Sequence, residues 1–277
     1  MQSFDNLNAA WAWFATKALT GKSVAGTTEL NNVSFTLENI NENLLTIREN
    51  FSLSYYLGEG IWYGAGSNSM EFISRFGKIW EKLSDDGVTN ESAYGYILKK
   101  KYGFDQIEKM VELLSKDPNS RRAVMNINFA RKNVIETNDE QCTIALQLLL
   151  RDGKLNMTGI MRSNDLWTGT PYDIFYFTEI QKYIANRLGV QYGTYTHFVT
   201  SLHVYDRDKT KVSKSILNYL NDEKVDVTID GQLLLDSAPG LYKIISKIID
   251  PKEAKKKAIE LAKSGNIVGG KDIENQN

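Results

Sequence analysis

The sequence predicts one mixed α/β domain, because helical and strand-like segments both occur along the 277 residues. No internal repeat and no linker-like stretch divides these segments. We therefore expect a single domain over residues 1–277, with a divergent lysine-rich helical segment from about residue 250.

Helical periodicity is clearest in four segments. Apolar residues recur at helical spacing in residues 6–19, 104–116, 173–188 and 251–263. Residues 44–82 are aromatic and mostly helical in pattern, but glycines interrupt them, so we expect a kinked or looser helix there.

Strand-like runs occupy much of the rest. Five runs have the composition of strands: residues 33–37, 122–129, 143–151, 155–161 and 194–205. Asp152-Gly153 is a strong hairpin dipeptide, so it predicts an antiparallel pair on either side of it. A polar, glycine-flanked turn is expected over residues 21–28.

Composition excludes several classes of function. The 33 Lys and Arg residues nearly balance the 34 Asp and Glu residues, so no basic face predicts binding to polymeric nucleic acid. A single cysteine excludes an internal disulfide framework and fits a reducing compartment. The N-terminus lacks the regions of a signal peptide, and no apolar run could span a membrane. We expect a cytoplasmic protein, or one in the host cytoplasm if a phage encodes it.

The lone cysteine, Cys142, opens an apolar strand, and a dense polar string occupies residues 161–173. A thiol with nearby Arg, Ser, Asn and Asp combines a soft nucleophile with cations that favour the thiolate and with donors that can hold an anionic substrate. The alternative interpretation is a small core residue, since free cysteines are among the most buried residue types.

Five blocks, in order, resemble motifs of the thymidylate synthase superfamily, which includes pyrimidine nucleotide hydroxymethylases. They are residues 59–66 (a glutamate-bearing helix), 117–122 (a double-arginine phosphate motif), Cys142 (the nucleophile), 162–165 (a second phosphate and base-binding motif) and 201–205 (a sugar-binding motif). The resemblance covers roughly residues 22–208 and is closest to the phage-type deoxycytidylate hydroxymethylases. It implies a mixed twisted sheet flanked by helices, with a face of the sheet at a homodimer interface.

The resemblance implies a site for a pyrimidine nucleoside monophosphate. Arginine binds a phosphate dianion through planar bidentate donors, and Arg121, Arg122 and Arg162 would supply this charge. Arg121 and Arg122 would be donated across the homodimer interface, although by themselves they fit an exposed turn.

The other residues implied to bind the nucleotide are Lys22, Ser163, Asn164, Asp165, His203 and Tyr205. His203 and Tyr205 lie two apart on a strand, so their side chains share one face. Without the resemblance, His203 fits a half-buried, satisfied histidine.

The implied chemistry begins when the Cys142 thiolate adds to carbon 6 of the pyrimidine, which makes carbon 5 nucleophilic. Carbon 5 then attacks the one-carbon unit of 5,10-methylenetetrahydrofolate, the expected co-substrate, and no metal is expected. Glu59 would handle protons and order water, a contribution of about 10²–10⁴-fold. Tyr94 would lie near the reacting carbon, and Trp80 and Asp165 near the folate. Trp80 also fits a plain core aromatic.

Asp173 is the residue that discriminates between bases. Thymidylate synthases have asparagine at the corresponding position, and its amide can both donate to and accept from a uracil. An ionised carboxylate only accepts hydrogen bonds, so it suits the amino group of cytosine and a protonated ring nitrogen 3. The alternative is a helix N-cap, since aspartate caps well. Asp173 therefore predicts a cytidylate substrate, with dCMP preferred.

The product depends on access of water to the intermediate. Residues 272–277 lack the apolar tail with which synthases close over the folate, so we expect water addition and 5-hydroxymethyl-dCMP. The alternatives are a CMP 5-hydroxymethylase, methylation of dCMP or dUMP as in thymidylate synthase, and, outside this class, a non-catalytic nucleotide-binding protein.

Overall fold

The structure, a computed structural model, describes residues 2–130 and 134–276. Its internal contacts define two compact units. The sheet unit comprises residues 1–51, 108–128 and 142–225, and the helical unit comprises residues 52–107, 129–141 and 226–277. Both units draw on three segments of the chain, so no single linker divides them. That the whole chain acts as one domain stays a prediction.

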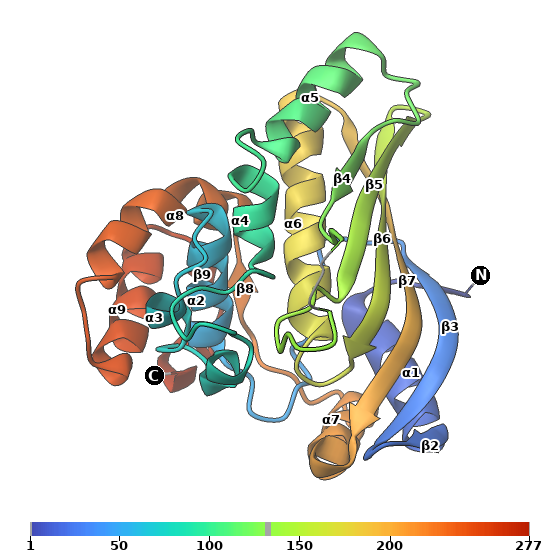
Figure 1. Cartoon of the computed structure of the whole chain (residues 1–277). Helices are drawn as coiled ribbons and strands as arrows, with labels where there is room; N and C mark the ends of the chain where they lie inside the picture. The colour runs from blue at the N-terminus through green and yellow to red at the C-terminus, as the bar shows by residue number, and fades with distance from the viewer. Residues whose placement is uncertain (1, 131–133, 277) are drawn as a thin grey trace. The chain divides into compact units, whose positions relative to one another are not determined.

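A seven-stranded mixed sheet forms the sheet unit (Figure 1). Its strands are β1 (Gln2–Phe4), β2 (Lys22–Val24), β3 (Thr27–Leu37), β4 (Val124–Asn126), β5 (Thr143–Arg151), β6 (Lys154–Asp165) and β7 (Gln191–Tyr205). The order is β1-β3-β7-β6-β5-β4, with β2 paired to β3. The β1–β3 and β6–β7 pairs are parallel and the other pairs are antiparallel. The predicted mixed sheet is confirmed.

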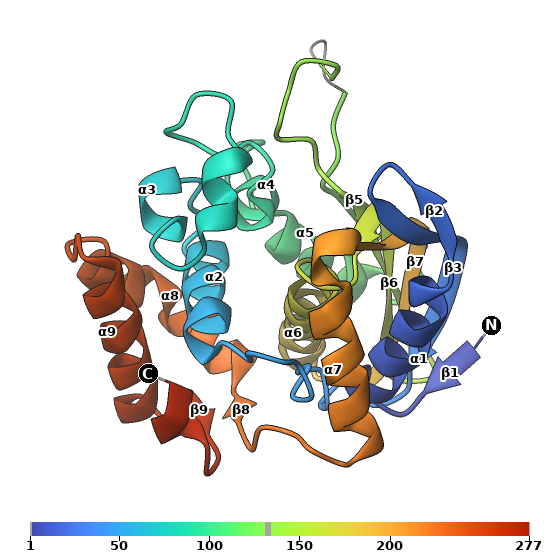
Figure 2. The same ribbon diagram turned by 90° about the horizontal axis from the view of Figure 1, so that it is seen from below.

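Three helices complete the packing of this sheet. Helices α1 (Leu7–Leu19) and α6 (Thr170–Leu188) contact the sheet directly. Helix α7 (Lys209–Leu220), which follows the short 3₁₀ helix η2 (Asp206–Asp208), packs beside α1 (Figure 2). The sequence anticipated α1 and α6, but not α7. Helix α5 (Gln106–Lys116), as anticipated, precedes β4.

Two tight turns set the register of the antiparallel strands. Asp152 and Gly153 have φ values of 51° and 72°, so both adopt the left-handed conformation of a two-residue hairpin turn. This confirms the predicted β5–β6 hairpin. Ala25 and Gly26, at φ 47° and 80°, make the same kind of turn between β2 and β3, where we expected only a turn.

Helix α2 (Leu53–Gly64) is the centre of the helical unit and contacts most of its other helices. The remaining elements are α3 (Met70–Ile73), η1 (Lys78–Lys82), α4 (Tyr94–Lys99), β8 (Thr228–Ile229), α8 (Gly231–Ile245), α9 (Pro251–Ser264), β9 (Val268–Gly269) and η3 (Ile273–Gln276). Strands β8 and β9 form a small antiparallel pair. Helix α8 was not anticipated, whereas α9 covers the lysine-rich segment.

The glycines of α2 serve close packing. A Cβ atom at Gly58 would lie 2.1 Å from Cγ of Phe76, and one at Gly64 would lie 2.5 Å from Cβ of Ala238 on α8. The helix is continuous and its residues are almost all buried. Our expectation of a kinked or looser helix was wrong, because the missing side chains make room for neighbouring elements.

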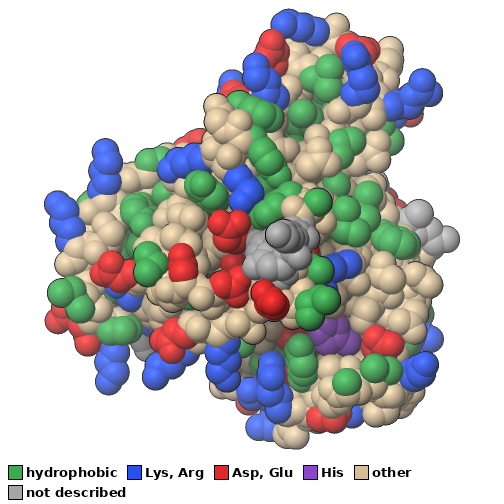
Figure 3. Space-filling view, in the orientation of Figure 1, with side chains coloured by type: hydrophobic (Ala, Val, Ile, Leu, Met, Phe, Trp, Pro, Cys, Tyr) green, Lys and Arg blue, Asp and Glu red, His purple; other side chains and the backbone are tan. Residues whose placement is uncertain are grey.

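Charged side chains are dispersed over the surface. On the face seen in Figure 3, Lys and Arg lie among acidic and neutral side chains and do not form one basic area. Within residues 2–130 and 134–276, no helix combines the length and the apolar character needed to cross a membrane.

Candidate active site

The strand register gathers predicted nucleotide-binding residues in one row across the sheet. Lys22 on β2 pairs with Glu29 on β3, Glu29 pairs with His203 on β7, and His203 pairs with Asp165 on β6. Ser163 lies opposite Ser201 two positions earlier on the parallel β6–β7 pair. Residues from distant parts of the sequence therefore meet at one end of the sheet.

His203 and Tyr205 lie side by side, as predicted from their spacing on a strand. Their ring centroids are 5.2 Å apart in an edge-to-face arrangement, and the Arg207 guanidinium lies over the Tyr205 ring at 4.2 Å. Glu29 accepts a hydrogen bond of 2.7 Å from the Ser201 hydroxyl. This bond, with smaller contributions from Asn31, Lys22 and His203, lowers the pKa of Glu29.

Cys142 and Arg162 are direct neighbours. The backbone N–H of Arg162 donates to the carbonyl of Cys142 at 2.9 Å, and an Arg162 guanidinium nitrogen lies 3.7 Å from Sγ. Cys142 is half-buried, so the sulfur is not a sealed core atom. A cation beside a partly accessible sulfur favours the thiolate. This geometry supports the nucleophile interpretation over the core one.

Asp173 lies inside the first turn of α6, whose N-cap is Gly169. The N-cap alternative is therefore wrong. Asp173 Oδ2 accepts a hydrogen bond of 2.8 Å from the side-chain amide of Asn164. Burial raises the pKa of the Asp173 carboxyl to about 7, the Asn164 hydrogen bond opposes this, and the nearby Asp165 adds to it. Over the whole residue, Asp173 is half-buried.

Two buried residues behind Asp173 were missed by the sequence reasoning. Asn164 Oδ1 contacts Nε2 of His197 at 3.1 Å, and His197 Nδ1 contacts the Tyr195 hydroxyl at 2.9 Å. His197 is fully buried, which lowers its pKa to about 3 and keeps the ring neutral. Their spacing of two on a strand, the same as that of His203 and Tyr205, was the one signal in the sequence.

Arg121 and Arg122 stand apart from this row of residues. Both are exposed in the turn that precedes β4, and Arg122 makes a loose ion pair with Asp117 at 3.7 Å. The structure places them on the surface of the sheet unit, where a second subunit could reach them. Their role in a partner's site stays a prediction.

The helical unit gathers the other three candidates around α2. Glu59, 7% exposed, lies on α2 with Trp62 and Tyr63 three and four residues later, on the same side of the helix. Trp80 packs edge-to-face on Trp62 with centroids 5.0 Å apart. Tyr94, the first residue of α4, packs on Tyr63 with centroids 6.1 Å apart.

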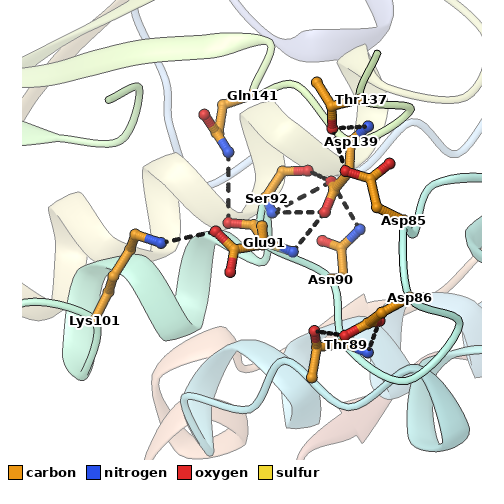
Figure 4. Close-up of polar contacts among 10 residues, drawn as sticks. All are labelled: Asp85, Asp86, Thr89, Asn90, Glu91, Ser92, Lys101, Thr137, Asp139 and Gln141. Atoms are coloured by element: carbon orange, nitrogen blue, oxygen red, sulfur yellow. Dashed lines mark hydrogen bonds and ion pairs between the residues drawn. The ribbon is translucent and has the colours of Figure 1, made fainter. Parts of the chain in front are cut away.

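A buried carboxylate, also missed from the sequence, anchors the segment that leads to Cys142. Asp139 is 2% exposed and accepts hydrogen bonds from the Asn90 side chain and the backbone N–H groups of Glu91 and Ser92 (Figure 4). The side-chain amide of Gln141 donates to the backbone carbonyl of Glu91 at 3.4 Å. These bonds tie the residues just before Cys142 to those just before Tyr94.

The expected folate can be tested against the residues themselves. Trp80 is half-buried, and its indole N–H donates to the Tyr55 hydroxyl at 3.1 Å, so an oriented aromatic ring remains partly accessible for a flat ligand. Asp165 accepts from the backbone N–H of Trp167 at 2.9 Å and from the hydroxyl of Thr168. A carboxylate can accept further donors, so each residue, taken within its own unit, has the chemistry that a pterin ring requires. Among the described residues, no cluster of metal-ligating side chains occurs.

The family model for thymidylate synthase matches residues 16–233, which is most of the chain. The chain therefore belongs to the thymidylate synthase family, a family of folate-dependent transferases that act on pyrimidine nucleotides. The matched range includes every predicted site residue and ends within α8.

Individual relatives fall into two groups by name. The chain is similar to the deoxyuridylate hydroxymethyltransferases of Pseudomonas phage M6 (30% identical over 57% of this chain and 46% of the relative) and Bacillus phage SP01 (31% over 69% and 54%). It is also similar to the thymidylate synthase of Clostridium beijerinckii (30% over 50% and 52%). The chain thus spans about half the length of the curated relatives it matches.

Proposed function

We propose that this protein transfers a one-carbon unit from 5,10-methylenetetrahydrofolate to carbon 5 of a cytidylate, preferring dCMP, and that water addition gives 5-hydroxymethyl-dCMP. The observation that carries the choice of base is Asp173. The residue is half-buried, and its carboxyl accepts a hydrogen bond on Oδ2 from Asn164. Above its pKa of about 7 the ionised group accepts the amino hydrogen of cytosine, whereas it faces the carbonyl oxygen of uracil unfavourably.

Each candidate residue has a defined task in this reaction. The Cys142 thiolate, favoured by Arg162, adds to carbon 6, and the electron pair of the 5,6 double bond becomes available at carbon 5. When bound, 5,10-methylenetetrahydrofolate supplies the one-carbon unit, and Trp80 and Asp165 would hold its ring. Glu59 orders water and moves protons near carbon 5, and Tyr94 lies near the same carbon.

The phosphate and sugar are bound by the polar end of the sheet. Arg162 and Ser163 bind the phosphate together with Lys22, and His203 and Tyr205 donate to the sugar hydroxyl. Asp173 and Asn164 then lie on the base side of the same sheet end. Loss of the carbon 5 proton with release of tetrahydrofolate leaves an exocyclic methylene on the base, and addition of water to it with release of the Cys142 thiolate completes the reaction.

The relatives support the product more directly than the base. Both phage proteins are named hydroxymethyltransferases, which favours water addition over methylation. The same names specify deoxyuridylate, so dUMP is the second candidate substrate. Asp173 favours dCMP because a carboxylate cannot donate to the carbonyl oxygen of uracil unless it is protonated.

Turnover of dCMP, CMP and dUMP with 5,10-methylenetetrahydrofolate in ¹⁸O-labelled water tests the substrate and the product together. We expect dCMP to be preferred and the product to carry ¹⁸O in a hydroxymethyl group. Asp173→Asn should weaken dCMP turnover and admit dUMP. A methylated product with dihydrofolate would contradict the proposed product, and an unchanged preference in Asp173→Asn would leave that residue without a role in base choice.

We further propose a homodimer in which Arg121 and Arg122 complete the partner's phosphate site. Cys142→Ser and the double variant Arg121→Ala/Arg122→Ala should each be inactive as pure proteins. Mixed subunits should regain about one quarter of wild-type activity, because half of the dimers then contain one intact site. Sedimentation measures the dimer, and absence of complementation within a dimer would place the two arginines in their own subunit's site or in none.

A further inference from the structure

Four side chains of the sheet unit form one continuous hydrogen-bonded chain that ends on Asp173. It runs from Tyr195 to His197 (2.9 Å), from His197 to Asn164 (3.1 Å) and from Asn164 to Asp173 Oδ2 (2.8 Å). Tyr195 and His197 are fully buried and Asn164 is 2% exposed. A buried polar chain is stable only when each donor meets an acceptor, so its direction is determined.

The direction of these hydrogen bonds follows from Asn164 Oδ1, the acceptor in the middle of the chain. Asn164 Oδ1 can only accept, so His197 Nε2 must carry the hydrogen that joins them. The ring is neutral, so Nδ1 is an acceptor and the Tyr195 hydroxyl donates to it. The Asn164 amide then points its N–H toward Asp173. Every donor in the chain faces the carboxylate.

Asp173 and His197 together hold the Asn164 amide in one orientation. Thr170 also bonds to Asn164 Oδ1, at 2.7 Å, but a hydroxyl can donate or accept and so tolerates either orientation of the amide. A rotated amide would turn its oxygen toward the ionised Asp173 carboxylate, which is repulsive, and would require the His197 tautomer that carries its hydrogen on Nδ1.

We propose that His197, acting through Asn164, is a positioning residue that holds Asp173 as a hydrogen-bond acceptor toward the base and thereby sets the preference for a cytosine over a uracil. This inference rests on the proposed function for its choice of nucleotide. Within residues 2–130 and 134–276, Asn164 is the one hydrogen-bond donor to the Asp173 carboxyl. The other carboxyl oxygen therefore remains for a ligand.

The protonation state of Asp173 connects this hydrogen-bonded chain to the choice of base. The Asn164 hydrogen bond lowers the pKa of Asp173 against the effect of burial, which raises it, and Asp165 also raises it. The other charged group nearby is Arg48, which lies over the rings of Trp167 and Tyr172 and donates to backbone carbonyls rather than to Asp173. Loss of the oriented amide should leave more Asp173 protonated, and a protonated carboxyl can donate to the carbonyl oxygen of uracil.

The test compares dCMP and dUMP in the wild type, His197→Phe and His197→Gln over a range of pH. We expect His197→Phe to lower the ratio of kcat/KM for dCMP to that for dUMP by about 5- to 10-fold at neutral pH. The pH at which this ratio falls to half of its alkaline value should move upward, because the pKa of Asp173 rises. His197→Gln, whose amide can donate at the same place, should lie between the two.

A matched control separates this role from general loss of packing. Gln181 is fully buried in the same unit and donates to the backbone carbonyls of Leu155 and Thr194, away from Asp173. Gln181→Leu should reduce stability without moving the base preference or its pH midpoint. An equal shift in Gln181→Leu would show that the effect of His197→Phe is merely structural and would overturn the inference.

The outcomes distinguish this inference from the proposed function. A wild type that prefers dUMP overturns both. A wild type that prefers dCMP, loses this preference in Asp173→Asn and keeps it with an unchanged pH midpoint in His197→Phe overturns only the role of His197.

A measurement on the unsubstituted protein covers the case in which His197→Phe does not fold. The chain has two histidines, so side-chain ¹⁵N NMR resolves His197 from His203. We expect His197 to be neutral with its hydrogen on Nε2 at neutral pH. A hydrogen on Nδ1, or a charged ring, would reverse the direction of the chain and overturn the proposal.

Discussion

Cys142 and Arg162 are in direct contact, and the contact joins the predicted nucleophile to a cation. The Arg162 guanidinium lies 3.7 Å from the sulfur, so its charge should stabilise the thiolate relative to the thiol. We expect Arg162→Gln to slow alkylation of Cys142 by iodoacetamide about three- to tenfold at neutral pH. Because Cys142 is the sole cysteine of the chain, loss of free thiol reports on this residue alone.

The exposed Arg187 supplies the control for this prediction. It pairs with Glu108 at 2.8 Å and is not a neighbour of the sulfur, so Arg187→Gln should leave the alkylation rate unchanged. An equal rate in the wild type and Arg162→Gln would mean that the arginine serves only the phosphate.

At the scale of single residues, the sequence was a better guide to which residues form the candidate site than to how those residues are arranged. The spacing of His203 and Tyr205 correctly placed both side chains together, because alternation along a strand is local. Asp173 could not be separated from an N-cap by sequence, because the start of α6 depends on the turn that ends at Gly169. His197 gave little signal beyond its spacing from Tyr195, because its partner Asn164 lies 33 residues away in the sequence, on the neighbouring strand β6.

At the scale of elements, α2 holds the helical-unit candidates in place through its glycines. A Cβ at Gly58 would overlap the Phe76 ring, whereas a Cβ at Gly240 on α8 would meet no atom within 4 Å. Overpacking of a core costs about 1–3 kcal/mol, so Gly58→Ala should lower the free energy of unfolding by that amount. Urea denaturation measures the change.

Gly240→Ala is the matched control, because it also places alanine at a helical glycine. It should leave the stability unchanged or raise it by up to about 1 kcal/mol, since alanine favours the helix. If Gly58→Ala were as harmless as Gly240→Ala, Phe76 would be free to move, and the close packing of α2 would not be needed for stability.

The lengths of elements show which patterns are reliable. Helices α1 and α6 were predicted nearly in full, because apolar residues recur at helical spacing along each of them and are buried. Strand β6 extends to Asp165, beyond the predicted end at residue 161, because its last residues pair with β7. These residues are polar, so the apolar pattern of the sequence did not include them. The α7 and α8 helices were missed. Helix α8 contains Pro239, a residue that usually interrupts a helix.

At the scale of the whole molecule, the buried pair Asp173 and His197 should shape stability against pH. The folded pKa of Asp173, about 7, lies above its ordinary 3.8, so the free energy of unfolding falls as pH rises from about 4 to about 7. The folded pKa of His197, about 3, lies below its ordinary 6.5, so the free energy of unfolding falls as pH drops from about 6.5 to about 3. The two effects oppose each other between these limits.

Asp173→Asn removes the first of these contributions and leaves the second. Relative to the wild type, the variant should therefore gain stability as pH is raised from about 5 to about 8. Urea unfolding at intervals over this range measures the difference. A difference that does not vary with pH would mean that Asp173 is already ionised throughout.

The sequence by itself determined the family and predicted the nucleophile and the other candidate residues, because these depend on residue identity and on order along the chain. It also determined the β5–β6 hairpin and the main helices, because their periodicities and turn dipeptides are local. Only the tertiary structure decided which polar groups support Asp173 and how Asp139 holds the segment before Cys142. The physical reason is that a buried polar group must find its hydrogen-bond partner in space, and strand register and loop packing, rather than neighbouring residues, supply that partner.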